Sequence, residues 1–151
     1  GDGLEAAMVF SSVVSGMPLV YSGQEAGLDR SLKFFDKDLI EWKEHKNTAL
    51  YKQLFSLKHS NEALWNGAHG GVMVRVYNDK MDQVISFYRE KNGDKVLPLI
   101  NFSSKPVTVT LRSDFYAGSY TELFSQQHYE LKGNDRFTLG AWSYLVLSHN
   151  Q

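Results

Sequence analysis

With 151 residues, of which 42% are hydrophobic and 13% aromatic, the chain can bury the core of one ordinary domain or two small ones, so disorder is not the default. The net charge of −1 gives no basic field for a phosphate backbone, and no stretch approaches the roughly 20 apolar residues of a membrane helix, so neither nucleic acid nor membrane is an expected partner. The absence of cysteine excludes disulfides and thiolate zinc sites, and a bacterial secreted, periplasmic or cytoplasmic location all stay open.

The first expected element is a helix over residues 4–14. Its apolar positions, among them Leu4, Met8, Phe10 and Val13, are too numerous for one narrow stripe. A surface helix has a single apolar stripe facing the core. We therefore expect this helix to be covered on more than one side.

The ten residues 16–25, Gly-Met-Pro-Leu-Val-Tyr-Ser-Gly-Gln-Glu, are the most informative segment of the chain. A proline opens a short apolar strand, and a polar turn that carries Glu25 closes it. A buried parallel strand delivers a charged group to a site in this way. The loop that follows, residues 26–42, mixes charges with aromatic rings, as loops that line sites do.

A second helix is predicted over residues 47–64, with Asn47 as its N-cap. One face carries the apolar residues of the segment, and the polar ones fall mostly on the other. The expected buried face consists of Leu50, Tyr51, Leu54, Phe55 and Leu57.

From Gly71 onward the hydrophobic period changes to two, which predicts half-buried strands. Asn92-Gly93 is the strongest hairpin signal, because both residues tolerate positive φ. The expected strands cover residues 72–77, 84–89, 96–102, 107–111, 120–124, 128–131, 136–139 and 142–148. About eight short strands imply an antiparallel Greek-key sandwich. We divide the chain into residues 1–64 and 65–151.

The motif in residues 16–25 resembles one found in a known enzyme family. The α-amylase superfamily, glycoside hydrolase family 13, carries Gly-x-Pro-x-x-Tyr-x-Gly-x-Glu in its last barrel strand. The residues that hold this pattern are Gly16, Pro18, Tyr21, Gly23 and Glu25. The resemblance implies an α+β fragment of a longer enzyme: residues 1–64 end a (β/α)8 barrel with helix, strand and helix, and residues 65–151 form the C-terminal β-sandwich.

The chemistry that the resemblance implies lies mostly outside this sequence. Retaining glycosidases need a nucleophile and an acid/base carboxylate roughly 5 Å apart. In the family these groups, and the calcium site of many members, precede the last barrel strand. We therefore expect no catalytic residue, metal or cofactor in this chain, and no hydrolysis by it alone. The parent would act on α-glucans such as starch or maltooligosaccharides; the linkage, and hydrolysis against transglycosylation, stay open.

Gln24 and Glu25 are the candidate substrate-binding residues, because the C-terminal face of a barrel strand is where barrel enzymes build their sites. The competing interpretation is that Glu25 anchors a loop by accepting backbone hydrogen bonds or by pairing with an arginine. Trp65 and Trp142 could stack on sugar rings, although packing is the stronger expectation. The five histidines show no metal-ligand spacing.

A second class of function stays open beside the enzyme part. The chain could be a non-catalytic β-sandwich module that binds carbohydrate or a partner protein. In either case residues 4–60 carry apolar surface meant for a barrel. We expect this surface to pack onto the β-domain or to be shared between two copies in a homodimer.

Overall fold

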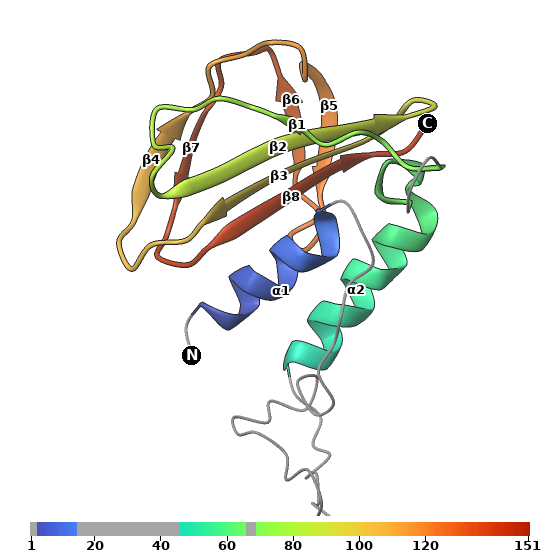
Figure 1. The fold of residues 1–151 in the computed structure, drawn as a ribbon, viewed down its shortest axis with the longest axis horizontal. Coiled ribbons are helices and arrows are strands. Elements are labelled where there is room, and N and C mark those ends of the chain that lie inside the picture. Colours follow the sequence, from blue (N-terminus) through green and yellow to red (C-terminus); the bar gives the residue numbers. More distant parts are fainter. Residues whose placement is uncertain (1–2, 15–45, 66–68) are drawn as a thin grey trace, which may run out of the picture.

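Two helices and two antiparallel sheets make up the part of the chain that the computed structural model describes, residues 3–14, 46–65 and 69–151. The helices lie side by side against one face of the larger sheet, and the smaller sheet lies across its other face (Figure 1). The mixed α+β class with mostly antiparallel strands is as expected. The predicted strand and loop over residues 16–42 lie outside the described residues.

The described residues form eight strands, as the sequence predicted, and every pairing is antiparallel. The larger sheet has the order β1-β2-β3-β8-β5-β6 and the smaller one pairs β4 with β7. The strands are β1 (Val74–Arg75), β2 (Val84–Lys91), β3 (Asp94–Asn101), β4 (Val107–Thr110), β5 (Gly118–Glu122), β6 (His128–Leu131), β7 (Arg136–Leu139) and β8 (Tyr144–His149).

The turn between β2 and β3 confirms the hairpin prediction. Asn92 has a φ of 52° and Gly93 a φ of 88°, and Lys91 pairs with Asp94 on either side of them. Two consecutive positive φ angles define the type I′ turn, whose twist matches that of the flanking strands. This turn fixes the register of the two longest strands.

The central strand β3 of the larger sheet is buried on both faces. Val96 and Ile100 of β3 belong to the core that the helices close, whereas Leu97 and Leu99 belong to the core under the smaller sheet. The prediction that the strands are half-buried is therefore wrong for β3. The reason is visible in its sequence, where a continuous apolar run replaces the polar alternation of a solvated face.

A proline stands in the middle of this central strand. Pro98 pairs with Val146 of β8, but the paired positions between β2 and β3 stop at Ser86 and resume at Arg89. A proline has no N–H to donate, and in sheets it is normally confined to edges, strand starts and bulges. Pro98 is thus an exception within an otherwise regular sheet.

Helix α1 (Leu4–Val13) is covered on more than one side, as predicted. Ala6, Met8, Val9 and Val13 are buried in the core between the helices and the sheet. Glu5 stands in the first turn, where a negative charge complements the helix dipole. The helix ends at Val14, whose backbone is extended.

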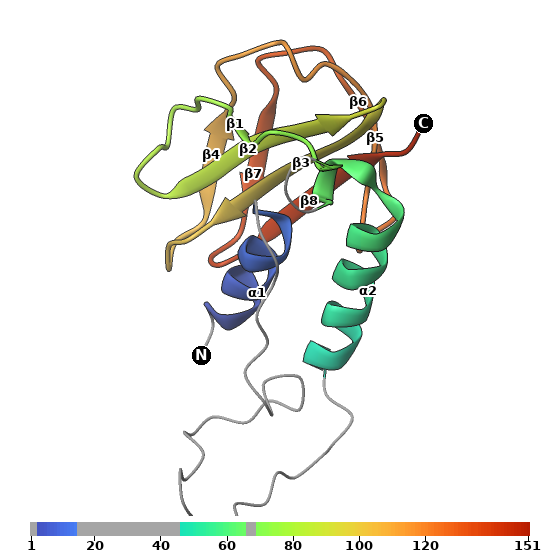
Figure 2. The ribbon, with the colours of Figure 1, turned by 45° about the vertical axis from the view of Figure 1, so that its right-hand side comes forward.

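Helix α2 (Lys46–Ser60) lies beside α1 on the same side of the sheet (Figure 2). Four of its five predicted core residues are buried; the exception is Phe55, which is 41% exposed and stacks on Tyr51. The predicted helix end at residue 64 is wrong, because the helix stops at Ser60 and a 3-10 turn, η2 (Glu62–Leu64), follows. Asn47 lies within the helix and does not precede it.

Asn61 explains where α2 stops. Its side chain accepts a hydrogen bond from the N–H of Ala63, which caps η2. The amide also donates to the carbonyls of Lys95 and His149 and to the Asn150 side chain, although Asn61 is fully buried. A buried amide that is satisfied in this way ties the end of the helix to β3 and β8.

The helices and the larger sheet share one core, so the apolar faces of α1 and α2 are covered within a single chain. The division at residue 64 and the homodimer through residues 4–60 stay predictions. Among the helices of the described residues, none is long and apolar enough to cross a membrane.

Candidate functional site

The predicted site residues Gln24 and Glu25 lie outside the described residues. Helix α1, which precedes them in the sequence, is held at its C-terminal end by one buried arginine. Arg89 of β2 is 1% exposed. Its Nε donates to the carbonyl of Gly71 at 2.9 Å, and its Nη2 donates to that of Trp65 at 3.2 Å. Its Nη1 donates to the carbonyls of Val13 and Val14, each at 3.3 Å.

The guanidinium therefore joins the end of α1, the segment after η2 and the start of the β-rich region. Burial lowers the pKa of Arg89, but an arginine keeps its charge in proteins. Burial, and then the positive charge of Arg89, lower the pKa of Lys58. The sequence analysis missed Arg89. Its spacing from Ile85 and Phe87 could have placed it on the same face of the strand as these two apolar residues.

An open recess of about 460 Å³ lies where the helices meet the end of β5. Ligand pockets typically enclose roughly 300–1,000 Å³. Residues of α1, α2, β5, β8 and the turn after β5 line it: Glu5, Ala49, Leu50, Gln53, Glu122, Phe124, Ser125 and Tyr144. Sequence reasoning singled out none of these for function, because they are scattered over four parts of the chain.

Glu122 shapes the floor of this recess. It is 3% exposed, and its carboxylate accepts hydrogen bonds from the N–H groups of Phe124 (3.0 Å), Ser125 (2.8 Å) and Val146 (2.9 Å). The carboxylate thus folds the turn after β5 back on its own strand and joins it to β8. A carboxylate held by three backbone donors is an anchor.

Tyr144 and Phe124 form the aromatic wall of the recess. Their ring centroids lie 5.5 Å apart at an interplanar angle of 76°, an edge-to-face contact. The Tyr144 hydroxyl donates to Glu5 Oε2 at 3.2 Å. Burial, together with the negative charge of Glu5, raises the pKa of Tyr144, so its hydroxyl stays a neutral donor.

The described residues that line the recess bring carboxylates, an amide and hydroxyls together beside aromatic rings. None of these residues is a nucleophile paired with an activating base. Across the described ranges no three His, Cys, Asp or Glu side chains gather in a way that could hold a metal ion.

The two tryptophans proposed for sugar stacking differ in their surroundings. Trp65 is 39% exposed, and its indole N–H donates to the carbonyl of His59 at 3.3 Å. Trp142 is half-buried and its ring lies against Gly3, where an added Cβ would stand 3.4 Å from it. Trp142 therefore packs against the start of α1, whereas part of the Trp65 ring is open to solvent.

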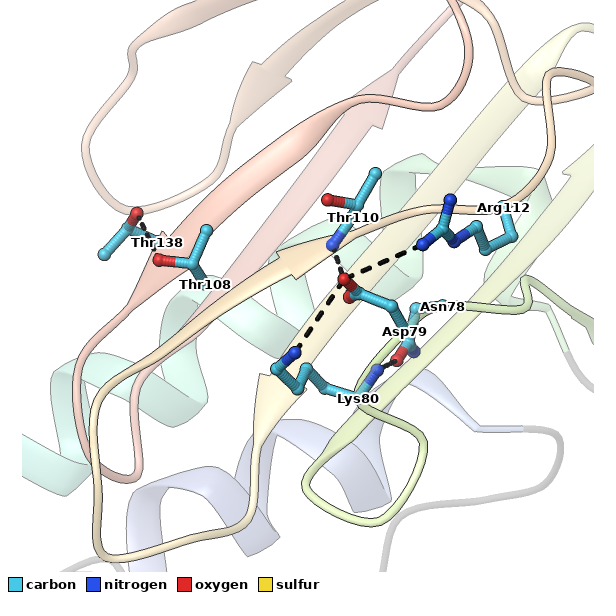
Figure 3. Close-up of polar contacts among 7 residues, drawn as sticks. All are labelled: Asn78, Asp79, Lys80, Thr108, Thr110, Arg112 and Thr138. Atoms are coloured by element: carbon cyan, nitrogen blue, oxygen red, sulfur yellow. Dashed lines mark hydrogen bonds and ion pairs between the residues drawn. The ribbon is translucent and has the colours of Figure 1, made fainter.

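A second polar cluster, shown in Figure 3, lies where the turn after β1 meets the end of β4. Asp79 Oδ1 accepts the N–H of Thr110 at 2.8 Å, and the Asp79 N–H donates to the Thr110 carbonyl at 3.1 Å. Lys80 and Arg112 approach the same carboxylate at 3.8 and 4.0 Å. Asn78 bridges to Leu111 beside it, so the cluster joins the two sheets structurally.

We expect Asp79→Asn to remove a pH-dependent part of the stability. The Thr110 N–H, and then Lys80 and Arg112, lower the pKa of Asp79 below its usual value. A depressed folded-state pKa stabilises the fold above the unfolded pKa of about 4, and this stabilisation is lost as pH falls through the folded pKa. Urea unfolding from pH 7 to pH 2.5 should show the gap between wild type and variant narrowing below about pH 4. Asp82→Asn controls for one lost charge in the same turn; a gap that is constant with pH would contradict the expectation.

The comparisons with known proteins agree with this architecture. Residues 74–146 match the family model described as maltogenic amylase, C-terminal domain. Over this stretch the chain is similar to members of the α-amylase superfamily. The matched residues run from the first residue of β1 into β8, so the amylase-type domain coincides with the sandwich of two sheets.

Two curated relatives extend the similarity to the α-amylase superfamily beyond that domain. An α-amylase 2 from Dictyoglomus thermophilum is 27% identical in an alignment 139 residues long, which covers 83% of this chain and 22% of the relative. A cyclomaltodextrinase from Thermoanaerobacter pseudethanolicus is 27% identical over 112 residues, 72% of this chain and 18% of the relative. The chain thus corresponds to about a fifth of the length of these α-amylase relatives.

A solved structure has a similar fold. The maltogenic α-amylase AmyB from Thermotoga neapolitana superposes with a TM-score of 0.82 at 21% identity, covering 99% of this chain and 37% of that one. The coverage includes the helices as well as the sandwich. The described residues thus share their mixed α+β fold with part of that amylase structure.

Proposed function

We propose that this chain is the C-terminal portion of a retaining glycoside hydrolase that acts on α-glucans such as starch or maltooligosaccharides. In this proposal residues 1–64 complete the catalytic (β/α)8 barrel, and residues 65–151 form a Greek-key β-domain that supports it. The catalytic carboxylates belong to the part of the enzyme upstream of this sequence, as does any calcium ion, so the chain alone is inactive.

One observation carries the proposal. The alignment with the α-amylase 2 runs over 139 residues, which is longer than the whole of residues 65–151. The similarity to an amylase therefore includes residues before the β-rich domain. The motif that ends in Glu25 also lies before that domain in the sequence.

The structure supports a division of labour between the two parts. Arg89, which comes from the β-rich part, holds the last carbonyls of α1. Only a single residue separates Val14 from the motif that begins at Gly16. We propose that the β-domain fixes the start of the barrel strand, and that Gln24 and Glu25 shape the edge of the substrate site at its other end.

The test compares this chain with the longer protein that contains it. We expect release of reducing sugar from maltoheptaose by the longer protein and none by the 151-residue chain. In the longer protein Glu25→Gln should raise KM several-fold while kcat changes by less than about tenfold, as expected for a residue that contributes mainly to substrate binding. Hydrolysis by the chain alone, no activity of the longer protein on α-glucans, or a loss of kcat beyond about a thousandfold in Glu25→Gln would overturn the proposal.

A further inference from the structure

We infer that the recess between the helices and the turn after β5 is a binding site for a neutral oligosaccharide. The residues that line it come from α1, α2, β5, β8 and the turn Leu123–Gln127.

The charges of the recess select the class of ligand. Among the described residues, its lining includes the carboxylates of Glu5 and Glu122 and no lysine, arginine or histidine. An anionic ligand such as a phosphate would meet repulsion without a compensating cation. The Glu122 carboxylate already accepts three backbone N–H groups, and Glu5 accepts the Tyr144 hydroxyl. The described residues also gather no group of three side chains that could hold a metal ion.

The remaining groups suit hydroxylated rings. Gln53 and Ser125 are exposed and offer an amide and a hydroxyl, which can donate to or accept from sugar hydroxyls. The half-buried rings of Phe124 and Tyr144 add an apolar wall of the kind that covers the C–H face of a pyranose.

Hydrogen bonds hold the wall of the recess that carries Phe124 and Ser125. Glu122 fixes the turn that carries Phe124 and Ser125, and it holds the neighbouring residue Val146 of β8 through the same carboxylate. A site whose walls are fixed before binding loses little conformational entropy when a ligand enters. The choice of an α-glucan as the natural oligosaccharide rests on the proposed function, whereas the class of neutral sugar rests on the recess itself.

The test titrates the 151-residue chain with maltotriose and follows backbone amide NMR shifts. We expect the largest shifts at Gln53, Phe124 and Ser125. Ala49→Arg places a long side chain in the recess from an exposed position on α2 and should weaken binding at least tenfold. Ser56→Arg adds the same charge to α2 outside the recess and should bind as wild type does.

Titrations with other ligands distinguish a result that contradicts this site from a result that contradicts the proposed function. Cellotriose that binds in the recess where maltotriose does not would support the site and contradict the α-glucan. Binding of only a sugar phosphate or only spermidine, or equal binding by Ala49→Arg and wild type, would overturn the site. An absence of shifts with every neutral trisaccharide would overturn it too, and the activity of the longer protein would still decide the proposed function.

Discussion

Arg89→Met should lower the free energy of unfolding by about 3 kcal/mol or more, since each buried polar group left without a partner costs roughly 1–3 kcal/mol. Four backbone carbonyls lose their donor in this variant, two of them at the end of α1. Methionine fills a similar length of the core but offers no N–H. Urea unfolding followed by circular dichroism measures the loss.

Two variants make this result specific. Arg75→Met is the same substitution at an exposed arginine of β1 and should change stability by less than about 0.5 kcal/mol. Arg89→Lys should fall between Arg89→Met and wild type, because an ammonium carries the charge but lacks the planar fork that reaches several carbonyls. Equal losses in Arg75→Met and Arg89→Met would show that the carbonyl contacts contribute nothing particular.

Leu54→Ala should destabilise the chain by about 2–4 kcal/mol, the usual range for a buried leucine. Leu54 is 1% exposed and belongs to the core that α2 shares with β2, β3 and β8. Because that core joins the helices to the sheet, we expect the helical signal and the tryptophan fluorescence to report one coincident transition. The measurement is urea unfolding of the variant with both probes.

The control for Leu54→Ala is the next residue on the same helix. Phe55 is 41% exposed, so Phe55→Ala removes more atoms but should destabilise by only about 1 kcal/mol. Two separate transitions, with the loss confined to the helical one, would contradict a shared core. That outcome would instead favour the division of the chain at residue 64.

Local patterns predicted most of the β-rich part from the sequence. The strands β6 and β7 begin and end where period two placed them, and Asn92-Gly93 forms the expected turn, because both signals depend on neighbouring residues. Burial of β3 on both faces could not be predicted in the same way. Burial of the second face of β3 depends on α1 and α2, which lie more than thirty residues earlier in the sequence and pack against that face.

The candidate site was harder to predict than the fold. The motif that ends in Glu25 identified the family, but the described residues contribute a different recess, assembled from Glu5, Gln53, Glu122 and Tyr144. These residues share no spacing, and only the packing of α1 and α2 against β8 brings them together. The exchange of hydrogen bonds around Glu122 could not be inferred from a carboxylate at the end of a predicted strand.

Pro98 has a consequence for the chain before it is folded. Residues 96–100, Val-Leu-Pro-Leu-Ile, are an uncharged apolar segment of the kind that stacks into cross-β fibrils when it is exposed. Proline interrupts such stacking, because each strand of a fibril must donate an N–H at every repeat. The native sheet tolerates the missing donor, since β8 pairs along the other side of β3. We therefore expect the residue that interrupts the β2–β3 pairing in the folded protein to reduce self-association of this segment in the unfolded chain.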